Sequence, residues 1–198
     1  MSSEATVTAL TTLLFNQFLE WHNRGYVAPS PVAVRHAVRA RNGADQAIWL
    51  ETACGCGDTT ALLTTQGRMV IGIERERALF EQAQARFPDP EQVRLFHADT
   101  LQALPKLLPQ LVGHVNFWLA RPAAQEAASP SILLELAEIG AHLRQWSRVA
   151  VMVDGIRRFD PANPDYPEFP TLDLLVDWAR ANDLLWHIEH DIFIARNF

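Results

Sequence analysis

Short apolar runs typical of buried strands alternate along the chain with longer segments whose apolar residues recur at helical spacing. The runs lie near residues 47–52, 68–74, 93–97, 115–119, 149–154, 184–189 and 191–195. Each gap between successive strands among the first five leaves room for a crossover helix, so these strands should be parallel. The last two are separated by about one residue and must be antiparallel to each other.

This alternation predicts an α/β fold. We expect a Rossmann-like, open, mostly parallel sheet of seven strands, with an antiparallel last strand and helices on both faces. Helices are expected near 59–66, 75–87, 101–108, 131–146 and 172–181, the fourth capped by Ser131, and before them a helix that starts at Pro31.

The length of 198 residues suits one domain over 1–198. An amphipathic helix within 1–26 precedes a core over 27–198, and this helix either covers the domain's own core or serves as a lid or as the face of a homodimer.

The composition of the chain limits the classes of partner that we expect. The net charge of −6 argues against a nucleic-acid partner, since proteins that bind phosphate backbones usually carry a basic surplus. No segment reads as a signal peptide or as a membrane span, so we expect a cytoplasmic protein without a membrane partner. The two cysteines, Cys54 and Cys56, lack the second ligand pair of a zinc site and are expected to pack beside a tight turn.

The stretch from Ile48 to Thr60 predicts a strand, a glycine-bearing turn and a helix N-terminus. Acids end the first three strands, Glu51, Glu74 and Asp99, and the carboxyl ends of parallel strands share one rim of a sheet. A carboxylate after the second strand suits a ribose diol, and one after the third suits an adenine amine.

Two nucleotide cofactors fit part of this pattern. A dinucleotide fingerprint would need a third glycine where this chain has Thr60. Glu51, just before the turn, would repel a pyrophosphate, whereas it would attract the amino end of S-adenosylmethionine. The pattern therefore favours S-adenosylmethionine as the cofactor.

At these positions the sequence resembles the class I S-adenosylmethionine-dependent methyltransferases, and among them the small bacterial type whose loop has the form E-T-G-x-x-x-G-D-T-T. The resemblance extends over roughly residues 27–198 and rests on LETACGCGDTT, VIGIERERALFEQAQARF, VRLFHADTLQALPKLL, VNFWLA, LLELAEI, VAVMVDGIRRF and DYPEFPTLDLL. It implies the methyltransferase fold, in which the last strand is antiparallel.

The resemblance also implies a set of cofactor-binding residues. Glu51, Ala53 and Gly57 would line the methionine end, Glu74 would bind the ribose and Asp99 the adenine. Ala53 stands where the family usually has glycine. The full set expected to bind the cofactor is Glu51, Thr52, Ala53, Cys54, Gly57, Thr59, Glu74, Arg75, Asp99 and Thr100.

The acceptor side departs from the family. Members of this family commonly have an acid and, two residues later, a histidine after the fourth strand, where this chain has Ala120-Arg121-Pro122. They also commonly have a pair of acids after the fifth strand, where only Asp154 remains before Gly155. We therefore predict no metal site. Asp154 is the candidate catalytic base or orienting group, with a structural turn role as its alternative, and Arg121, Arg157 and Tyr166 are the candidate substrate residues.

The leading hypothesis is a metal-independent methyltransferase for a small-molecule acceptor, with O-methylation of a sugar or secondary metabolite as the expected reaction. The alternative is an S-adenosylmethionine-binding module without transfer activity, which serves as a partner subunit or sensor. A nicotinamide-dependent reductase is a third, less favoured reading.

Overall fold

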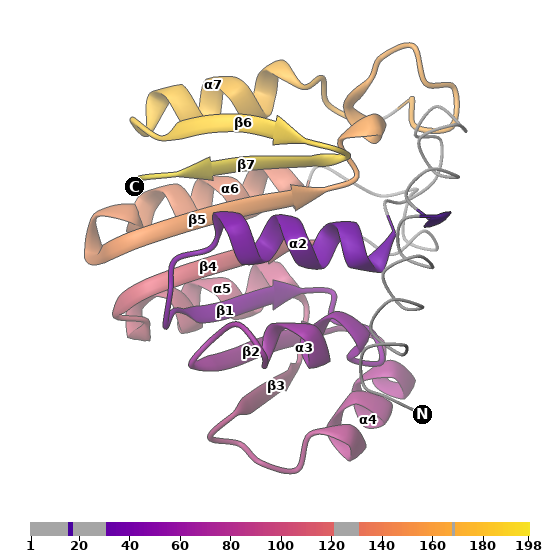
Figure 1. Cartoon of the computed structure of the whole chain (residues 1–198), viewed down its shortest axis with the longest axis vertical. Helices are drawn as coiled ribbons and strands as arrows, with labels where there is room; N and C mark the ends of the chain where they lie inside the picture. The colour runs from indigo at the N-terminus through magenta and orange to yellow at the C-terminus, as the bar shows by residue number, and fades with distance from the viewer. Residues whose placement is uncertain (1–15, 18–30, 121–130, 168) are drawn as a thin grey trace.

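The computed structural model describes residues 16–17, 31–120, 131–167 and 169–198, and within them seven strands form one sheet (Figure 1). The strand order is β3-β2-β1-β4-β5-β7-β6, and β7 alone runs antiparallel to its neighbours. The strands are β1 Ile48–Thr52, β2 Met69–Glu74, β3 Val93–His97, β4 Gly113–Leu119, β5 Trp146–Asp154, β6 Leu185–Glu189 and β7 Ile192–Arg196. The predicted α/β sheet is confirmed.

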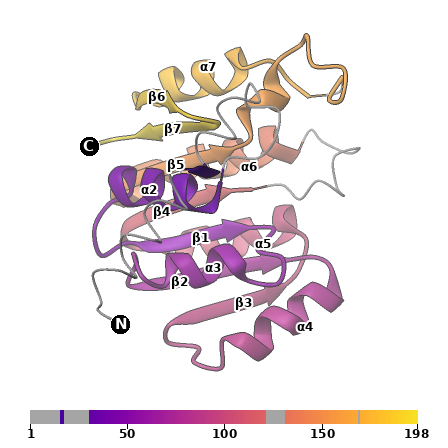
Figure 2. The same cartoon turned by 45° about the vertical axis from the view of Figure 1, so that its right-hand side comes forward.

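Helices cover both faces of this sheet, α2 and α3 on one and α5 and α6 on the other (Figures 1 and 2). Adjacent residues of a strand point to opposite faces, so Phe117 of β4 packs in the core beneath α5, α6 and α7, and Trp118 packs in the core beneath α2 and α3. The described helices are α2 Val32–Asn42, α3 Asp58–Leu63, α4 Arg77–Arg86, α5 Thr100–Leu107, α6 Ser131–His142 and α7 Asp173–Ala181.

Several helix limits differ from those predicted. Helix α3 ends at Leu63 instead of residue 66, and Pro31 is the N-cap of α2 instead of its first helical residue. Helix α6 begins at Ser131 itself and ends at His142, and Trp146, expected in the helix, begins β5. The reason is burial: the Trp146 ring packs 5.1 Å from that of Phe117, and its indole N–H donates to the carbonyl of Leu111 at 3.0 Å.

Some expectations fall outside the described residues. The N-terminal amphipathic helix, its role as a lid and the homodimer face lie there, except that residues 16–17 are helical. Arg121 lies there as well. In the described part of the chain, no helix has the length and apolar character needed to span a bilayer.

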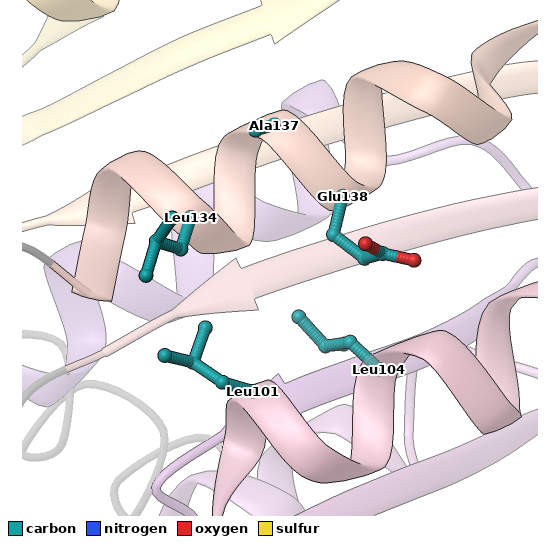
Figure 3. A pocket seen from close by; sticks show the side chains of 5 residues that line it. All are labelled: Leu101, Leu104, Leu134, Ala137 and Glu138. Atoms are coloured by element: carbon teal, nitrogen blue, oxygen red, sulfur yellow. The ribbon is translucent and has the colours of Figure 1, made fainter.

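A groove of about 350 Å³ separates α5 from α6. Figure 3 shows Leu101 and Leu104 of α5 facing Leu134 of α6, with the Glu138 carboxylate at one side. Leu134 is 54% exposed, so the groove is open to solvent. It shares no residue with the cavity at the carboxyl ends of the strands described below.

Candidate functional site

The chain turns sharply after β1. Ala53, Gly55 and Gly57 all have left-handed backbone conformations, with φ of 56°, 58° and 89°. The amide of Cys54 donates to the carbonyl of Ile73 at 3.0 Å, which ties the turn to β2. Helix α3 then begins at Asp58 with Gly57 as its N-cap. The alternation of left-handed residues aims backbone N–H groups and a helix N-terminus at the space above β1.

Glu74, at the end of β2, holds this turn in place. Its Oε2 accepts a hydrogen bond from the Gly55 amide at 2.8 Å, and its Oε1 accepts from the Glu76 amide at 2.7 Å. The side chain is buried, and these two bonds give each of its oxygens a hydrogen-bond donor. Each oxygen keeps a second lone pair, and the predicted role of Glu74 at a ribose remains a prediction.

The conformation of Ala53 leads to a stability prediction. A left-handed conformation costs an L-residue about 1–2 kcal/mol, and glycine adopts it freely. Ala53→Gly should therefore stabilise the fold by about 1 kcal/mol and raise the melting temperature by about 2–4 °C in a thermal unfolding experiment.

Gly57→Ala is the matched control, and it should lower the melting temperature. At Gly57 a Cβ would lie 2.5 Å from Cε2 of Phe87, in addition to the unfavourable φ. A lower melting temperature for Ala53→Gly would show that the turn does not carry the strain assigned to it.

A cavity of about 330 Å³ opens at the carboxyl ends of β1, β4 and β5. This is the edge at which ligands bind in open α/β sheets, and the volume is that of a small-molecule site. The residues that line it and had been predicted for the site are Glu51, Ala53, Cys54, Thr59, Asp154 and Arg157. Arg35 of α2 and Leu79 of α4 also line it and had not been predicted.

Glu51 is the buried acid of the cavity wall. It is 1% exposed, and its Oε2 accepts a hydrogen bond from the Thr60 hydroxyl at 2.7 Å. Burial raises the pKa of Glu51 to about 7, against the opposing effects of Thr60, Arg39 and Arg35. Near neutral pH the carboxyl is therefore poised to ionise, and a cationic ligand in the cavity would favour its charged form.

Asp154 lies across the cavity at the end of β5. Its Oδ2 accepts from Arg35 Nη1 at 3.3 Å, and its Oδ1 has no hydrogen-bond partner among the described residues. Burial raises the pKa of Asp154, and the charges of Arg35, Arg157 and Arg158 oppose this rise. The arrangement leaves one carboxylate oxygen able to accept a proton or a hydrogen bond.

Two arginines follow Asp154 in the short 3-10 helix Ile156–Phe159. Arg157 pairs with the buried carboxylate of Asp191, whose Oδ1 also accepts from the Arg157 amide at 3.0 Å. The Arg158 guanidinium lies 5.6 Å from the ring centre of Tyr166. Tyr166 thus contacts a cavity arginine and does not itself line the cavity.

The remaining predicted cofactor residues do not line this cavity either; they are Thr52, Gly57, Glu74, Arg75, Asp99 and Thr100. Thr52 points to the opposite face of the sheet from Glu51, as strand geometry requires. Gly57 shapes the turn, and Asp99 is the N-cap of α5, where its carboxylate accepts from the Leu101 amide at 2.9 Å. The predicted contact of Asp99 with adenine would use its other acceptor sites and is untested.

Cys54 lines the cavity but is 5% exposed, and it packs against Gly72, where an added Cβ would lie 3.0 Å from its Sγ. Burial raises the pKa of the Cys54 thiol, so the thiol stays protonated. Within the described ranges, no group of three or more His, Cys, Asp or Glu side chains is placed to hold a metal ion.

Arg35 and Arg39 are the residues that the sequence reading missed. They lie one helical turn apart on α2, beside Val34 and Val38, which pack against the sheet. The presence of two arginines beside an apolar stripe could have indicated that they lie near the sheet. The position of α2 over the strand ends, however, could not be predicted from the sequence.

Comparison with solved structures identifies the fold. A Clostridium thermocellum protein assigned to the rRNA methylases matches with a TM-score of 0.55 and 13% identity, over 83% of this chain and 95% of its own. A Streptococcus mutans protein assigned to the methyltransferases, crystallised with SAH, has a TM-score of 0.53 and 16% identity, over 86% of this chain and 98% of its own. A TehB-like SAM-dependent methyltransferase from Corynebacterium glutamicum has a TM-score of 0.51 and 17% identity, over 94% and 97%.

No protein-family model matches the sequence, and no curated protein sequence matches it significantly. At identities of 13–17% the solved structures establish the architecture, which agrees with the strand order and the antiparallel β7. The chain has the fold of the class I S-adenosylmethionine-dependent methyltransferases.

Proposed function

We propose that this protein is an S-adenosylmethionine-dependent methyltransferase that acts on a small-molecule acceptor. The observation that carries the proposal is Glu51, a buried carboxylate in the wall of a cavity at the glycine turn. The Glu51 carboxylate suits the ammonium group of S-adenosylmethionine, whereas a pyrophosphate placed against this carboxylate would be repelled.

The details of the turn also disfavour a nicotinamide dinucleotide. Thr60 occupies the position of the third glycine in the dinucleotide fingerprint, and its hydroxyl donates to Glu51 instead of leaving space for close helix packing. In the proposed complex, Glu51 would hold the methionine end, Glu74 the ribose and Asp99 the adenine.

The acceptor would lie on the Asp154 side of the cavity. S-adenosylmethionine supplies an electrophilic methyl group on its sulfonium. Ala120 and Gly155 line the cavity and are small, which leaves space for a hydroxyl-bearing ligand beside Asp154. We propose that the Asp154 carboxylate, which lines the cavity, accepts the hydroxyl proton, so that transfer to oxygen on a sugar or secondary metabolite needs no metal.

A nucleic-acid acceptor is less favoured for this chain. At least two neighbours of the same fold are assigned to rRNA methylation, the Clostridium thermocellum protein and the 23S rRNA methyltransferase ErmE. This chain has a net charge of −6, however, and a polyanionic backbone would be repelled unless basic residues gathered on one face. The cavity volume of about 330 Å³ fits a small molecule.

A second candidate is a cofactor-binding module without transfer activity. Ala120 and Gly155 favour it, because they replace acids found in sequences that this chain resembles. The experiment is to incubate the purified protein with radiolabelled S-adenosylmethionine and a panel of hydroxylated small molecules, in parallel with a binding titration. Label transfer that depends on Asp154 supports the enzyme. Cofactor binding with no transfer to any acceptor, unchanged by Asp154→Ala, supports the module.

A further inference from the structure

Among the described residues, the buried Arg39 has no hydrogen-bond partner. The side chain is 1% exposed, and Nε, Nη1 and Nη2 have no hydrogen-bond partner among the described residues. Its Cζ lies 4.4 Å from the centre of the Trp118 ring, so the guanidinium stacks on an aromatic face. Burying a cation in this way has a large free-energy cost, which a counter-charge nearby would offset.

The position of Arg39 over Trp118 identifies that counter-charge. Trp118 of β4 is the direct register partner of Glu51 of β1, and both lie on the face of the sheet that α2 covers. The charge of Glu51 is the largest opposing influence on the Arg39 guanidinium, and that of Asp154 is weaker. Arg39 does not line the cavity, whereas Glu51 does. We therefore expect Arg39 to act on a ligand mainly through Glu51.

The other charged groups around Glu51 do not replace Arg39. Arg35, from the same helix, is paired with Asp154. Glu74 of β2 has the same sign as Glu51 and opposes its ionisation, and α3 contributes only the neutral Thr60 hydroxyl. Cys54, which is neutral, completes the surroundings. Of the two α2 arginines that act on Glu51, Arg39 is thus the one that forms no ion pair with another acid in the described part of the chain.

We propose that Arg39 is a positioning residue that keeps Glu51 ionised, so that Glu51 can bind the α-ammonium group of S-adenosylmethionine. The inference rests on the proposed function, since it assumes that the cavity takes this cofactor. It assigns a role to a residue that touches neither the cofactor nor the acceptor.

The pH dependence has a defined sign. With Arg39 present, Glu51 titrates with a pKa of about 7, so affinity for the ammonium group should rise as pH increases through 7. Removing a neighbouring cation raises the pKa of a carboxyl, by about 1–2 units for a close pair. At pH 7 the ionised fraction of Glu51 would then fall about five- to fiftyfold, and higher pH would restore it.

The test is calorimetric binding of S-adenosylhomocysteine (SAH) and of methylthioadenosine, which lacks the amino-acid end, between pH 6.5 and 8.5. Arg39→Met should weaken SAH binding about five- to fiftyfold at pH 7, less at pH 8.5, and leave methylthioadenosine binding unchanged. Arg39→Lys should retain most of the affinity because it keeps the charge. Arg41→Met is the matched control, because Arg41 is an exposed arginine of the same helix that pairs with Glu189.

Three results would overturn the inference. The first is that Arg39→Met binds SAH as tightly as the unmodified protein does. The second is that Arg39→Met loses affinity for SAH and for methylthioadenosine equally and at every pH, which would indicate a packing role. If Arg39→Met does not fold, Arg39→Lys provides the third result. A folded Arg39→Lys variant that loses SAH binding at every pH would show that the charge of Arg39 has no such role. Failure of the unmodified protein to bind either ligand would instead refute the proposed function.

Discussion

Replacing Asp154 with asparagine is expected to lower kcat for methyl transfer about 100- to 10,000-fold while leaving SAH affinity within about threefold. Asparagine preserves the shape of the side chain and can still accept from Arg35, but it cannot take a proton from an acceptor hydroxyl. The measurement is transfer of radiolabelled methyl to an acceptor found in the panel, with SAH binding followed by calorimetry.

Asp177→Asn is the matched control for this change. Asp177 lies on α7, with its side chain 73% exposed and paired only with Arg180 at 3.6 Å, so its loss should not alter transfer. A kcat for Asp154→Asn equal to that of the unmodified enzyme would show that Asp154 has a structural role, the alternative predicted from the sequence. A parallel fall in SAH affinity would place Asp154 at the cofactor instead of the acceptor.

The second prediction concerns Glu51→Gln, which should weaken SAH binding about 10- to 150-fold at pH 8. A charge-assisted hydrogen bond between a carboxylate and an ammonium group contributes about 1.5–3 kcal/mol, and the neutral glutamine amide can accept from the ammonium group only without the attraction of a negative charge. Glutamine can still accept from the Thr60 hydroxyl, so the fold should persist. Calorimetry should also show that the variant loses the rise in affinity between pH 6.5 and 8.

Methylthioadenosine separates the two possible causes of such a loss. It has no ammonium group, so its affinity should be the same for Glu51→Gln and for the unmodified protein. Glu81→Gln, at an exposed site that pairs with Arg77, controls for the change of overall charge. Equal weakening of both ligands by Glu51→Gln would indicate that the turn has collapsed, and unchanged SAH binding would remove Glu51 from the cofactor site.

The sheet could be predicted from the sequence because each strand is a compact apolar run and the length of each connection fixes whether the two strands that it joins are parallel or antiparallel. Glu51 and Asp154 could be placed at one edge because the carboxyl ends of parallel strands meet there. Both acids line the cavity. The position of Ala53 in the turn could also be predicted. Its left-handed conformation could not, because nothing in an alanine side chain indicates a positive φ.

The remaining features of the site and of the fold depend on tertiary packing, which the local sequence pattern does not encode. Glu74 also ends a strand, but both of its oxygens accept backbone amides that hold the turn. Arg39 precedes all of the described strands, and only the docking of α2 brings its guanidinium over Trp118. Trp146 follows a helical segment, and its burial against Phe117 places it in β5.

Titration of the folded protein with SAH in a calorimeter tests the central claim most directly, because it needs no acceptor. We predict saturable one-to-one binding in about the micromolar to millimolar range typical of enzyme ligands, tighter at pH 8 than at pH 6.5. A folded sample that gives no binding heat with SAH or S-adenosylmethionine at either pH would contradict the account.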